Sequence, residues 1–355
     1  MISAGIFEKW GGRAINAARA SQYHQTHRKE ALTAVRVIET YNSQRLTPAL
    51  KKIADEYSSD VFGSRRYAPW LYVYALVSGK FKEGWMPDNF FGRMVCPHVN
   101  KNLMVVTGYK TLSNVVLKTE ALPDAGYYID GIFFDRDLAV IDAAELRAAC
   151  RNAKGKLFVK KNRSGRGEGV LTLPVEQLTE ERFKQIGDCV IQMPIQQNEF
   201  FDRIIAGSVA TIRLTTVKDR SGRIALRAAY LRLGRTDTEW VQSNNSIRVA
   251  IQCSTGELDN FGYTPDWKRC ECHPDTRYRF QNQKIPKFKN AVELCLALHS
   301  KVPHFTVIGW DVTLDQVEQI KLMEWNSNHP DIKFSEATTG PCFLGLNWEK
   351  YAKKA

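Results

Sequence analysis

The stretch "FTVIGWDVTLDQVEQIKLMEWNSN", residues 305–328, decides the fold. Two apolar runs flank a polar turn near Leu314–Gln316, which predicts a hairpin of two antiparallel strands. Because side chains alternate along a strand, four residues of the second run are predicted to share an inward-facing side: Ile320, Leu322, Glu324 and Asn326. A buried carboxylate needs a cation or hydrogen-bond partners. Glu324 therefore marks either a strand end that emerges into solvent or a metal site.

Asp311, in the first run of the hairpin, adds a third oxygen donor to Glu324 and Asn326. Oxygen ligands that converge from paired strands suit Mg²⁺, which shares its coordination sphere with phosphates. A carboxylate that bridges two ions, with a second acid and an amide beside it, suits a two-ion phosphate clamp. The alternative is that Asp311 is a turn residue and Glu324 an acid at the rim of a sheet.

A second informative stretch is "LFVKKNRSGRGEGVLTL", residues 157–173. A strand-like run ends in Lys160 and Lys161, and a glycine-rich loop joins it to a second strand-like run. The glycines of this loop are Gly165, Gly167 and Gly169. Glycines let backbone N–H groups approach an anion closely, and the lysines add positive charge. The loop lacks a P-loop ending and does not lead into a helix. It indicates either a lid over phosphates or an ordinary hairpin with a glycine turn.

Arg213 lies within the apolar, β-branched run "SVATIRLTTVKD", residues 208–219. A guanidinium group stays charged in proteins, so in a half-buried strand it needs an anion. A phosphate or a substrate carboxylate would bind it bidentately. A structural ion pair is the alternative.

Composition narrows the classes of partner. The chain has 355 residues, with 50 basic and 38 acidic ones, and its net charge of +12 favours anionic partners. No zinc finger, RNP motif or dense basic tract supports nucleic acid as that partner. No apolar run reaches the roughly 20 residues of a membrane helix, and the opening residues do not resemble a signal peptide. The eight cysteines are expected as free thiols, so we expect a cytoplasmic protein of unknown oligomeric state.

The order of the patterns predicts an α+β fold. Helical spacing dominates up to about residue 95, apolar runs then alternate with helical segments, and hairpin-forming strands follow residue 185. Four parts are predicted: a helical N-terminal region over 1–98, an α/β segment over 99–150, a lid subdomain over 151–198 and a C-terminal subdomain with the metal site over 199–355.

These residues resemble the ATP-grasp superfamily, in the order of a lysine and glycine-rich lid, a hinge strand, a strand arginine, and Asp followed by Glu-x-Asn. The closest resemblance is to the sugar-transfer-associated ATP-grasp proteins of polysaccharide assembly. The resemblance implies the ATP-grasp fold, in which two α+β subdomains grip ATP, here with a helical N-terminal region. Lys161 departs from the pattern, because proline often follows the lid lysine.

The resemblance also implies residue roles. It gives nucleotide binding to Lys160, to Lys101, to the lid Ser164–Gly169, and to the hinge residues Gln192, Met193 and Ile195, with Glu199 or Asn198 on the ribose. It gives magnesium binding to Asp311, Glu324 and Asn326. It makes Arg213 and Lys160 catalytic, and it places Arg232 and Asn245 on the acceptor side.

The implied activity is an ATP-dependent ligase that joins a carboxylate to an amine through an acyl phosphate. Its cofactors would be ATP and two Mg²⁺ ions, with Mn²⁺ as a substitute. The implied acceptor is a uronic acid of a nucleotide sugar, capsule or O-antigen glycan. The alternatives are an ATP-grasp kinase that phosphorylates a hydroxyl, and a non-catalytic nucleotide-binding partner of a glycan-assembly complex.

The segment "RCECHPDTRYRF", residues 269–280, matches no pattern of this family. Cys270, Cys272 and His273 would begin a zinc site only with a second pair of ligands, which the sequence does not supply. A surface loop with free thiols is therefore expected over a metal site.

Overall fold

The computed structural model describes residues 4–153, 155–164, 169–236, 238, 240–241 and 245–354. The chain forms two compact units. The helical unit consists of Met1–Val95, Asp266–Lys268 and Ile332–Ala355, and the sheet unit consists of Cys96–Pro265 and Arg269–Asp331. The subdomain boundaries expected from the sequence stay a prediction.

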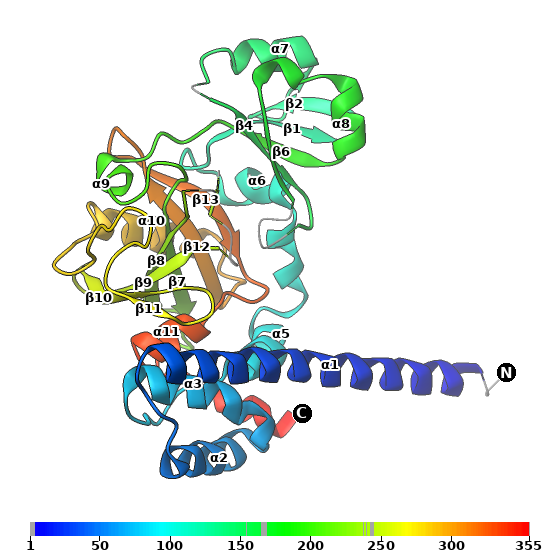
Figure 1. Ribbon diagram of the computed structural model, residues 1–355. Helices are drawn as coiled ribbons and strands as arrows, with labels where there is room; N and C mark the ends of the chain where they lie inside the picture. Colours follow the sequence, from blue (N-terminus) through cyan, green and yellow to red (C-terminus); the bar gives the residue numbers. More distant parts are fainter. Residues whose placement is uncertain are drawn as a thin grey trace. The chain divides into compact units, whose positions relative to one another are not determined.

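The helical unit confirms the predicted helical N-terminal region. Its main helices are α1 (Ala4–Tyr41), α2 (Pro48–Phe62), α3 (Ala68–Ser78) and α11 (Lys333–Thr338). Thr47 caps α2 by accepting a hydrogen bond from the backbone N–H of Leu50, and Gly63 ends this helix with a φ of 73°. Figure 1 shows α1 along α3 and running on beyond the other helices of this unit.

Short helical segments occur in both units. In the helical unit these are η1 (Arg65–Tyr67), α4 (Asp88–Phe90), the π-helical η2 (Phe91–Val95) and η6 (Trp348–Lys354). In the sheet unit they are α5 (Cys96–Val99), η3 (Lys101–Gly108), η4 (Lys110–Leu112), α6 (Ser113–Leu117), η5 (Val175–Gln177) and α9 (Glu199–Asp202). No helix in the described part of the chain is long and apolar enough to cross a membrane.

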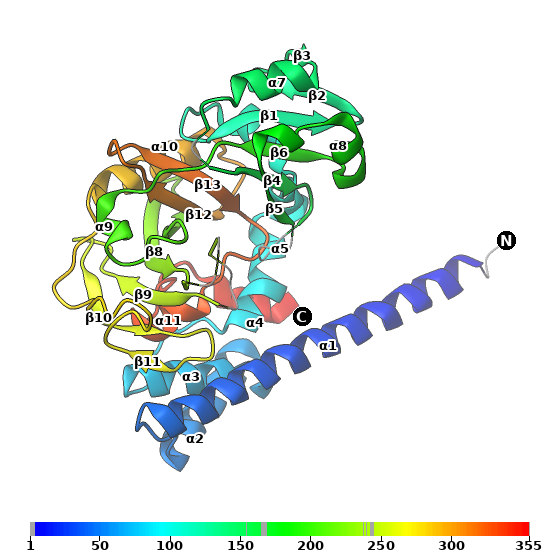
Figure 2. The ribbon, with the colours of Figure 1, turned by 45° about the horizontal axis from the view of Figure 1, so that its top comes forward.

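The first sheet of the sheet unit is antiparallel and has six strands. They are β1 (Asp124–Ile129), β2 (Ile132–Asp135), β3 (Val140–Ile141), β4 (Leu157–Lys161), β5 (Val170–Leu173) and β6 (Cys189–Gln192), in the order β3-β2-β1-β6-β4-β5. Helices α7 (Ala143–Ala149) and α8 (Glu180–Ile186) lie beside it in Figure 2. Leu146 of α7 and Phe183 of α8 pack with Val159 and Ile191 of the strands in one core.

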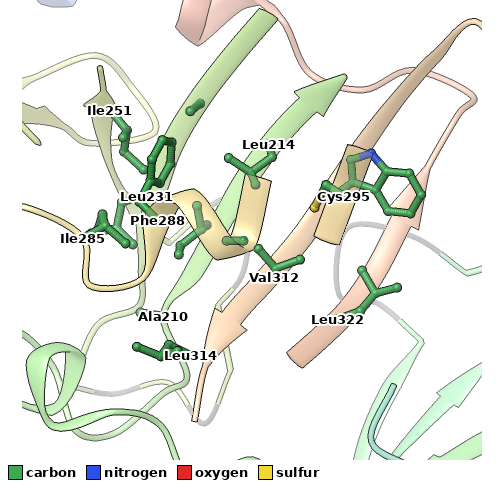
Figure 3. Packing of buried hydrophobic residues seen from close by; sticks show 14 of the residues in the cluster. Ala210, Leu214, Leu231, Ile251, Ile285, Phe288, Cys295, Val312, Leu314 and Leu322 are labelled. Atoms are coloured by element: carbon green, nitrogen blue, oxygen red, sulfur yellow. The ribbon is translucent and has the colours of Figure 1, made fainter. Parts of the chain in front are cut away.

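The second sheet is antiparallel and has seven strands. They are β7 (Thr211–Lys218), β8 (Ile224–Leu233), β9 (Ile247–Ile251), β10 (Leu258–Tyr263), β11 (Arg269–Cys270), β12 (Val307–Leu314) and β13 (Ile320–Asn326), in the order β11-β10-β9-β8-β7-β12-β13. One face packs against α10 (Phe288–Lys301). Figure 3 shows Leu214, Leu231 and Val312 of the strands near Phe288 and Cys295 of α10. Because strand side chains alternate, the opposite face carries the polar residues between them.

The predicted hairpin 305–328 is present as β12 and β13, but one expectation about it is wrong. The register shifts between Asp311, which opposes Glu324, and Val312, which opposes Leu322. Met323 is the extra residue of this bulge, so the alternation reverses there. Leu322 joins the α10 core together with Trp325, whereas Glu324 opposes Asp311 on the other face. Ile320 and Leu322 therefore do not share a side with Glu324. The predicted α+β fold is confirmed by the two sheets and the helical region.

Candidate functional site

Arg213 and Asp311 form the centre of the polar face of the seven-stranded sheet. They are cross-strand partners on β7 and β12. The Nε and Nη2 atoms of Arg213 donate to the two carboxylate oxygens of Asp311 at 2.6 and 2.8 Å. Burial alone would raise the pKa of Asp311, but Arg213 lowers it below its ordinary value, so Asp311 is charged. Burial alone would lower the pKa of Arg213, but Asp311 offsets this and the pKa is raised.

Glu324 stands directly opposite Asp311 and contacts Lys110 from η4. Its side chain is 29% exposed, whereas that of Lys110 is 9% exposed. Lys110 Nζ also lies 3.4 Å from the carbonyl oxygen of Thr107. Lys110 was missed in the sequence, although it is the one charged residue between Leu103 and Leu117. A single charged residue in an otherwise uncharged stretch is the sequence signal that would have pointed to Lys110.

Lys160, which the sequence assigned to the nucleotide phosphates, projects from β4 toward the bulge of β13. Its Nζ donates to the carbonyl oxygen of Met323 at 3.0 Å. Burial lowers the pKa of Lys160, and the nearby Glu324 counteracts part of that effect while Lys110 adds to it. The six-stranded sheet therefore contributes a partly buried amine to the region where Lys110 and Glu324 meet.

The six-stranded sheet also brings a buried acid to this region. Asp124 on β1 accepts hydrogen bonds from Gln192 Nε2 at 2.7 Å and from the Tyr127 hydroxyl at 3.0 Å. Burial raises the pKa of Asp124, although both hydrogen bonds and the charge of Lys160 counteract it. Gln192, predicted as a hinge residue, thus orients Asp124 by its side chain.

Gly309 gives Arg213 the room it needs beside Asp311. A Cβ at position 309 would lie 2.9 Å from the Cβ of Pro330 and 3.4 Å from Nη1 of Arg213. Such a contact would force the arginine or the proline to move. The glycine of the "GWD" motif is therefore explained by the close approach of a side chain.

The three predicted metal ligands lie on two paired strands. Asp311 opposes Glu324, and Gly309, two residues before Asp311, opposes Asn326. Directly opposed side chains on antiparallel strands have Cβ atoms about 5 Å apart, a separation at which two carboxylates can share a divalent ion. The two acids and the amide therefore fit Mg²⁺, which prefers oxygen ligands. No group of three His, Cys, Asp or Glu residues suited to a metal occurs in the described part of the chain.

The predicted lid is described only in part. Gly165 and Gly167 lie outside the described residues. The Ser164 hydroxyl donates to the carbonyl oxygen of Lys161 at 2.7 Å, and the Lys161 N–H donates to the carbonyl oxygen of Gly169 at 3.0 Å. Lys101 is exposed at the start of η3, with a φ of 53°.

The predicted hinge follows β6. The N–H of Met193 donates to the carbonyl oxygen of Pro123 at 2.8 Å, and Ile195 is partly buried. Glu199 is exposed at the start of α9. Asn198 caps that helix by accepting from the N–H of Phe200 at 3.0 Å.

Of the two predicted acceptor residues, Arg232 lies on the same sheet as Arg213, and Asn245 lies just before a strand of that sheet. Arg232 on β8 places its Nη1 3.7 Å from Oδ2 of Asp311. Asn245 is partly buried, two residues before β9. The structure thus brings Arg213, Arg232, Asp311 and Glu324 together.

The loop that follows β11 is built around His273. His273 is buried, with its Nε2 2.9 Å from the carbonyl oxygen of Gly234, and its Nδ1 accepts from the N–H of Asp275 at 3.3 Å. Asp275 in turn binds Arg235 bidentately at 2.6 and 2.8 Å. Cys270 and Cys272 are free thiols. This loop therefore anchors the chain just beyond β8.

The solved structures that resemble this chain include two nucleotide complexes, and both have low sequence identity to it. An ADP complex of purK, N5-carboxyaminoimidazole ribonucleotide synthetase, is 11% identical with a TM-score of 0.41, over 69% of this chain and 54% of that one. The β-γ-ATP complex of biotin carboxylase from Campylobacter jejuni is 13% identical with a TM-score of 0.44, over 91% of this chain and 68% of that one. The chain spans little more than half the length of the synthetase.

A third solved structure is the ATP-grasp ligase PsnB complexed with minimal precursor. It is 11% identical with a TM-score of 0.41, over 71% of this chain and 64% of that one. No curated protein matches the sequence. The family model described as sugar-transfer associated ATP-grasp matches residues 182–347, which hold Arg213, Asp311 and Glu324. The family whose model matches this segment is the one that the sequence predicted.

Proposed function

We propose that this protein is an ATP-dependent carboxylate–amine ligase. A carboxylate oxygen of the acceptor attacks the γ-phosphorus of ATP, the bond to the β–γ bridging oxygen breaks, and ADP leaves. The nitrogen of an amine then attacks the acyl carbon of the acyl phosphate. The bond from that carbon to the phosphate oxygen breaks, phosphate leaves, and the nitrogen loses a proton as the amide forms.

One observation carries the proposal: Asp311 and Glu324 are direct cross-strand partners, and Arg213, Lys110 and Lys160 surround them. Two acids beside three cations form a site for a phosphate chain and its metal ion. The match of residues 182–347 to an ATP-grasp family supports the same conclusion.

Each residue of the site has a role in this reaction. Asp311, Glu324 and Asn326 would hold Mg²⁺ or Mn²⁺, with two ions expected. When bound, the metal neutralises negative charge on the transferred phosphoryl group. Arg213 holds the oxygens of that group bidentately, and Lys160 binds the nucleotide phosphates. Lys110 takes the role that the sequence gave to Lys101, because it contacts Glu324.

The lid and the hinge complete the nucleotide site in this proposal. The lid Ser164–Gly169 covers the phosphates and excludes water, which would otherwise hydrolyse the acyl phosphate. The N–H of Met193 is bound to Pro123, and Pro194 has no N–H. Ile195 is then the hinge residue that presents its N–H to adenine, with Glu199 near the ribose.

The substrates proposed are a uronic acid of a nucleotide sugar, capsule or O-antigen glycan as acceptor, and an amino acid or another amine as nucleophile. Arg232 and Asn245 line the acceptor side. The net charge of +12 favours such an anionic substrate. We expect the reaction in the cytoplasm, where ATP is supplied.

A phosphate-release screen with Mg-ATP tests the proposal. Uronic acids and nucleotide sugars are offered in pairs with amino acids, and each partner is also offered alone. We expect release only when a carboxylate and an amine are both present. Transfer of phosphate to a hydroxyl without an amine would identify a kinase instead. Binding of Mg-ATP without turnover of any pair would favour a non-catalytic nucleotide-binding protein.

A further inference from the structure

The three-residue 3₁₀ turn η4 has little stability of its own. A turn of this length closes too few backbone hydrogen bonds to offset the conformational entropy that it loses, so contacts with other parts of the chain must hold it in place. It carries Lys110, whose ammonium group is the partner of Glu324. The position of this ammonium group therefore depends on what holds the turn.

Asn162, in the turn that follows β4, binds the residue next to Lys110 at two points. Its Oδ1 accepts from the N–H of Thr111 at 3.1 Å, and its Nδ2 donates to the Thr111 hydroxyl at 3.1 Å. Because a backbone N–H can only donate, the first contact also fixes which way the amide group of Asn162 faces. Thr111 is 4% exposed, so water has little access to compete for these two hydrogen bonds.

Backbone hydrogen bonds hold the same part of the chain at two further points. The N–H of Arg163 donates to the carbonyl oxygen of Gly108, two residues before Lys110, at 2.6 Å. The N–H of Asn162 donates to the carbonyl oxygen of Asp188, which directly precedes β6, at 3.0 Å. Asn162 is thus anchored to the six-stranded sheet by its backbone and to η4 by its side chain.

One short segment therefore reaches both members of the ion pair at the candidate site. Asn162 binds the residue next to Lys110, 51 positions away in the chain. Lys160, two positions before Asn162, donates to the carbonyl oxygen of the residue next to Glu324. The segment that leaves β4 thus contacts the chain beside the cation and beside the acid.

We infer that Asn162 is a positioning residue of the nucleotide site. It acts through Lys110, because it holds η4 where the ammonium group meets Glu324 and a phosphate of the bound nucleotide. The inference deepens the proposed function and rests on its assignment of Lys110 to the phosphates. The attraction between an ammonium group and an anion falls with distance, so a turn that is held less firmly would weaken phosphate binding without abolishing it. The sequence alone did not single out Asn162.

The test measures by calorimetry the affinity of the full chain for Mg-AMPPNP, an ATP analogue that is not hydrolysed. Asn162→Ala removes both side-chain hydrogen bonds, Thr111→Val removes only the bond to the hydroxyl, and Thr111→Ser keeps it. Asn260→Ala is the matched control, because Asn260 is exposed on β10. Urea unfolding of each variant measures its stability separately.

We expect Asn162→Ala to weaken the binding of Mg-AMPPNP roughly 5- to 30-fold, by loss of two neutral hydrogen bonds. Thr111→Val should weaken it less, and Thr111→Ser should lie closer to the wild type than Thr111→Val does. Asn260→Ala should match the wild type. A purely structural role of Asn162 would instead lower the stability and leave the affinity of the folded protein unchanged.

A second measurement tests whether Asn162 acts through Lys110. In a Lys110→Met background, Asn162→Ala should change the affinity for Mg-AMPPNP by less than about twofold, because the group that it positions is gone. If Asn162→Ala does not fold, Thr111→Val takes its place in both backgrounds.

Two results would overturn the inference and leave the proposed function intact. They are an affinity that Asn162→Ala leaves unchanged, and a loss of affinity by the same factor with and without Lys110. Failure of the wild type to bind Mg-AMPPNP would refute the proposed function, and the inference with it.

Discussion

Asp311 and Glu324 face each other across β12 and β13, yet each carboxylate contacts a basic side chain from a different part of the chain. Asp311 binds Arg213 of the neighbouring strand, and Glu324 binds Lys110 from a 3₁₀ turn more than 200 residues earlier. These contacts hold two acids side by side without leaving either charge unpaired, which would be costly in a buried region. A divalent ion would take over part of that pairing.

Glu324→Gln should reduce the rate of ATP turnover roughly 10²–10³-fold, by analogy with the loss of one oxyanion-hole donor. The fold should survive, because the side chain is 29% exposed and the amide has the same shape. Phosphate release measures the effect. Glu293→Gln on α10, at a site 59% exposed, is the matched control. Near-normal turnover by Glu324→Gln would remove the metal site from consideration.

Lys110→Met should lower the affinity for Mg-ATP and destabilise the sheet unit by about 1–3 kcal/mol, since it removes a charge-assisted contact to Glu324. A double-mutant cycle of Lys110→Met with Glu324→Gln, followed by urea unfolding, should show coupling between the two residues. The exposed pair Lys289 and Glu293, 3.7 Å apart, provides a reference cycle with a smaller coupling. Equal coupling in the two cycles would argue against a structured pair at the site.

Gly309→Ala should destabilise the protein by about 1–3 kcal/mol, because the added methyl group overlaps with Pro330 and crowds Arg213. The rate of ATP turnover should fall by more than the loss of folded protein explains, because Arg213 would have to move. Gly207→Ala is the control, because the nearest atoms to a Cβ there are 3.9 Å away. Urea unfolding and phosphate release check both effects. If the two alanine variants behave alike, Gly309 has no steric role.

His299 should make the protein less stable as the pH falls from 6.5 toward 4. Trp310 Nε1 donates to the Thr216 hydroxyl, which contacts His299 Nδ1 at 2.7 Å, and His299 Nε2 lies 3.1 Å from the carbonyl oxygen of Phe305. The carbonyl oxygen of Phe305 can only accept, so Nε2 carries a proton, and a neutral imidazole then accepts at Nδ1 from the Thr216 hydroxyl. Burial lowers the pKa of His299 to about 4.

Since an unfolded histidine takes up its proton near pH 6.5, protonation stabilises the unfolded state relative to the folded one over that interval. Denaturant unfolding at several pH values should show a shallower pH dependence for His299→Asn than for the wild type. His304→Asn, at an exposed position, should keep the wild-type dependence. A His299→Asn curve parallel to that of the wild type would contradict the neutral, buried imidazole.

Local sequence patterns predicted most of the fold. The strand of Arg213 and the hairpin of Asp311 and Glu324 depend on residues close to one another in the chain, so propensity and alternation reveal them. The order of the site residues also pointed to the ATP-grasp resemblance that the family model supports. The roles of the individual site residues stay predictions.

Alternation by itself wrongly put Glu324 on the same side as Leu322, because one extra residue at Met323 reverses the two faces of β13. Such a bulge depends on pairing with β12, and a single strand does not encode its partner's register. Lys110 was missed for a related reason, since its contact with Glu324 joins residues 214 positions apart. The sequence by itself determined which acids and cations the protein has and which strands carry them. Only tertiary pairing decided which of them meet, because ion pairs form through space and not along the chain.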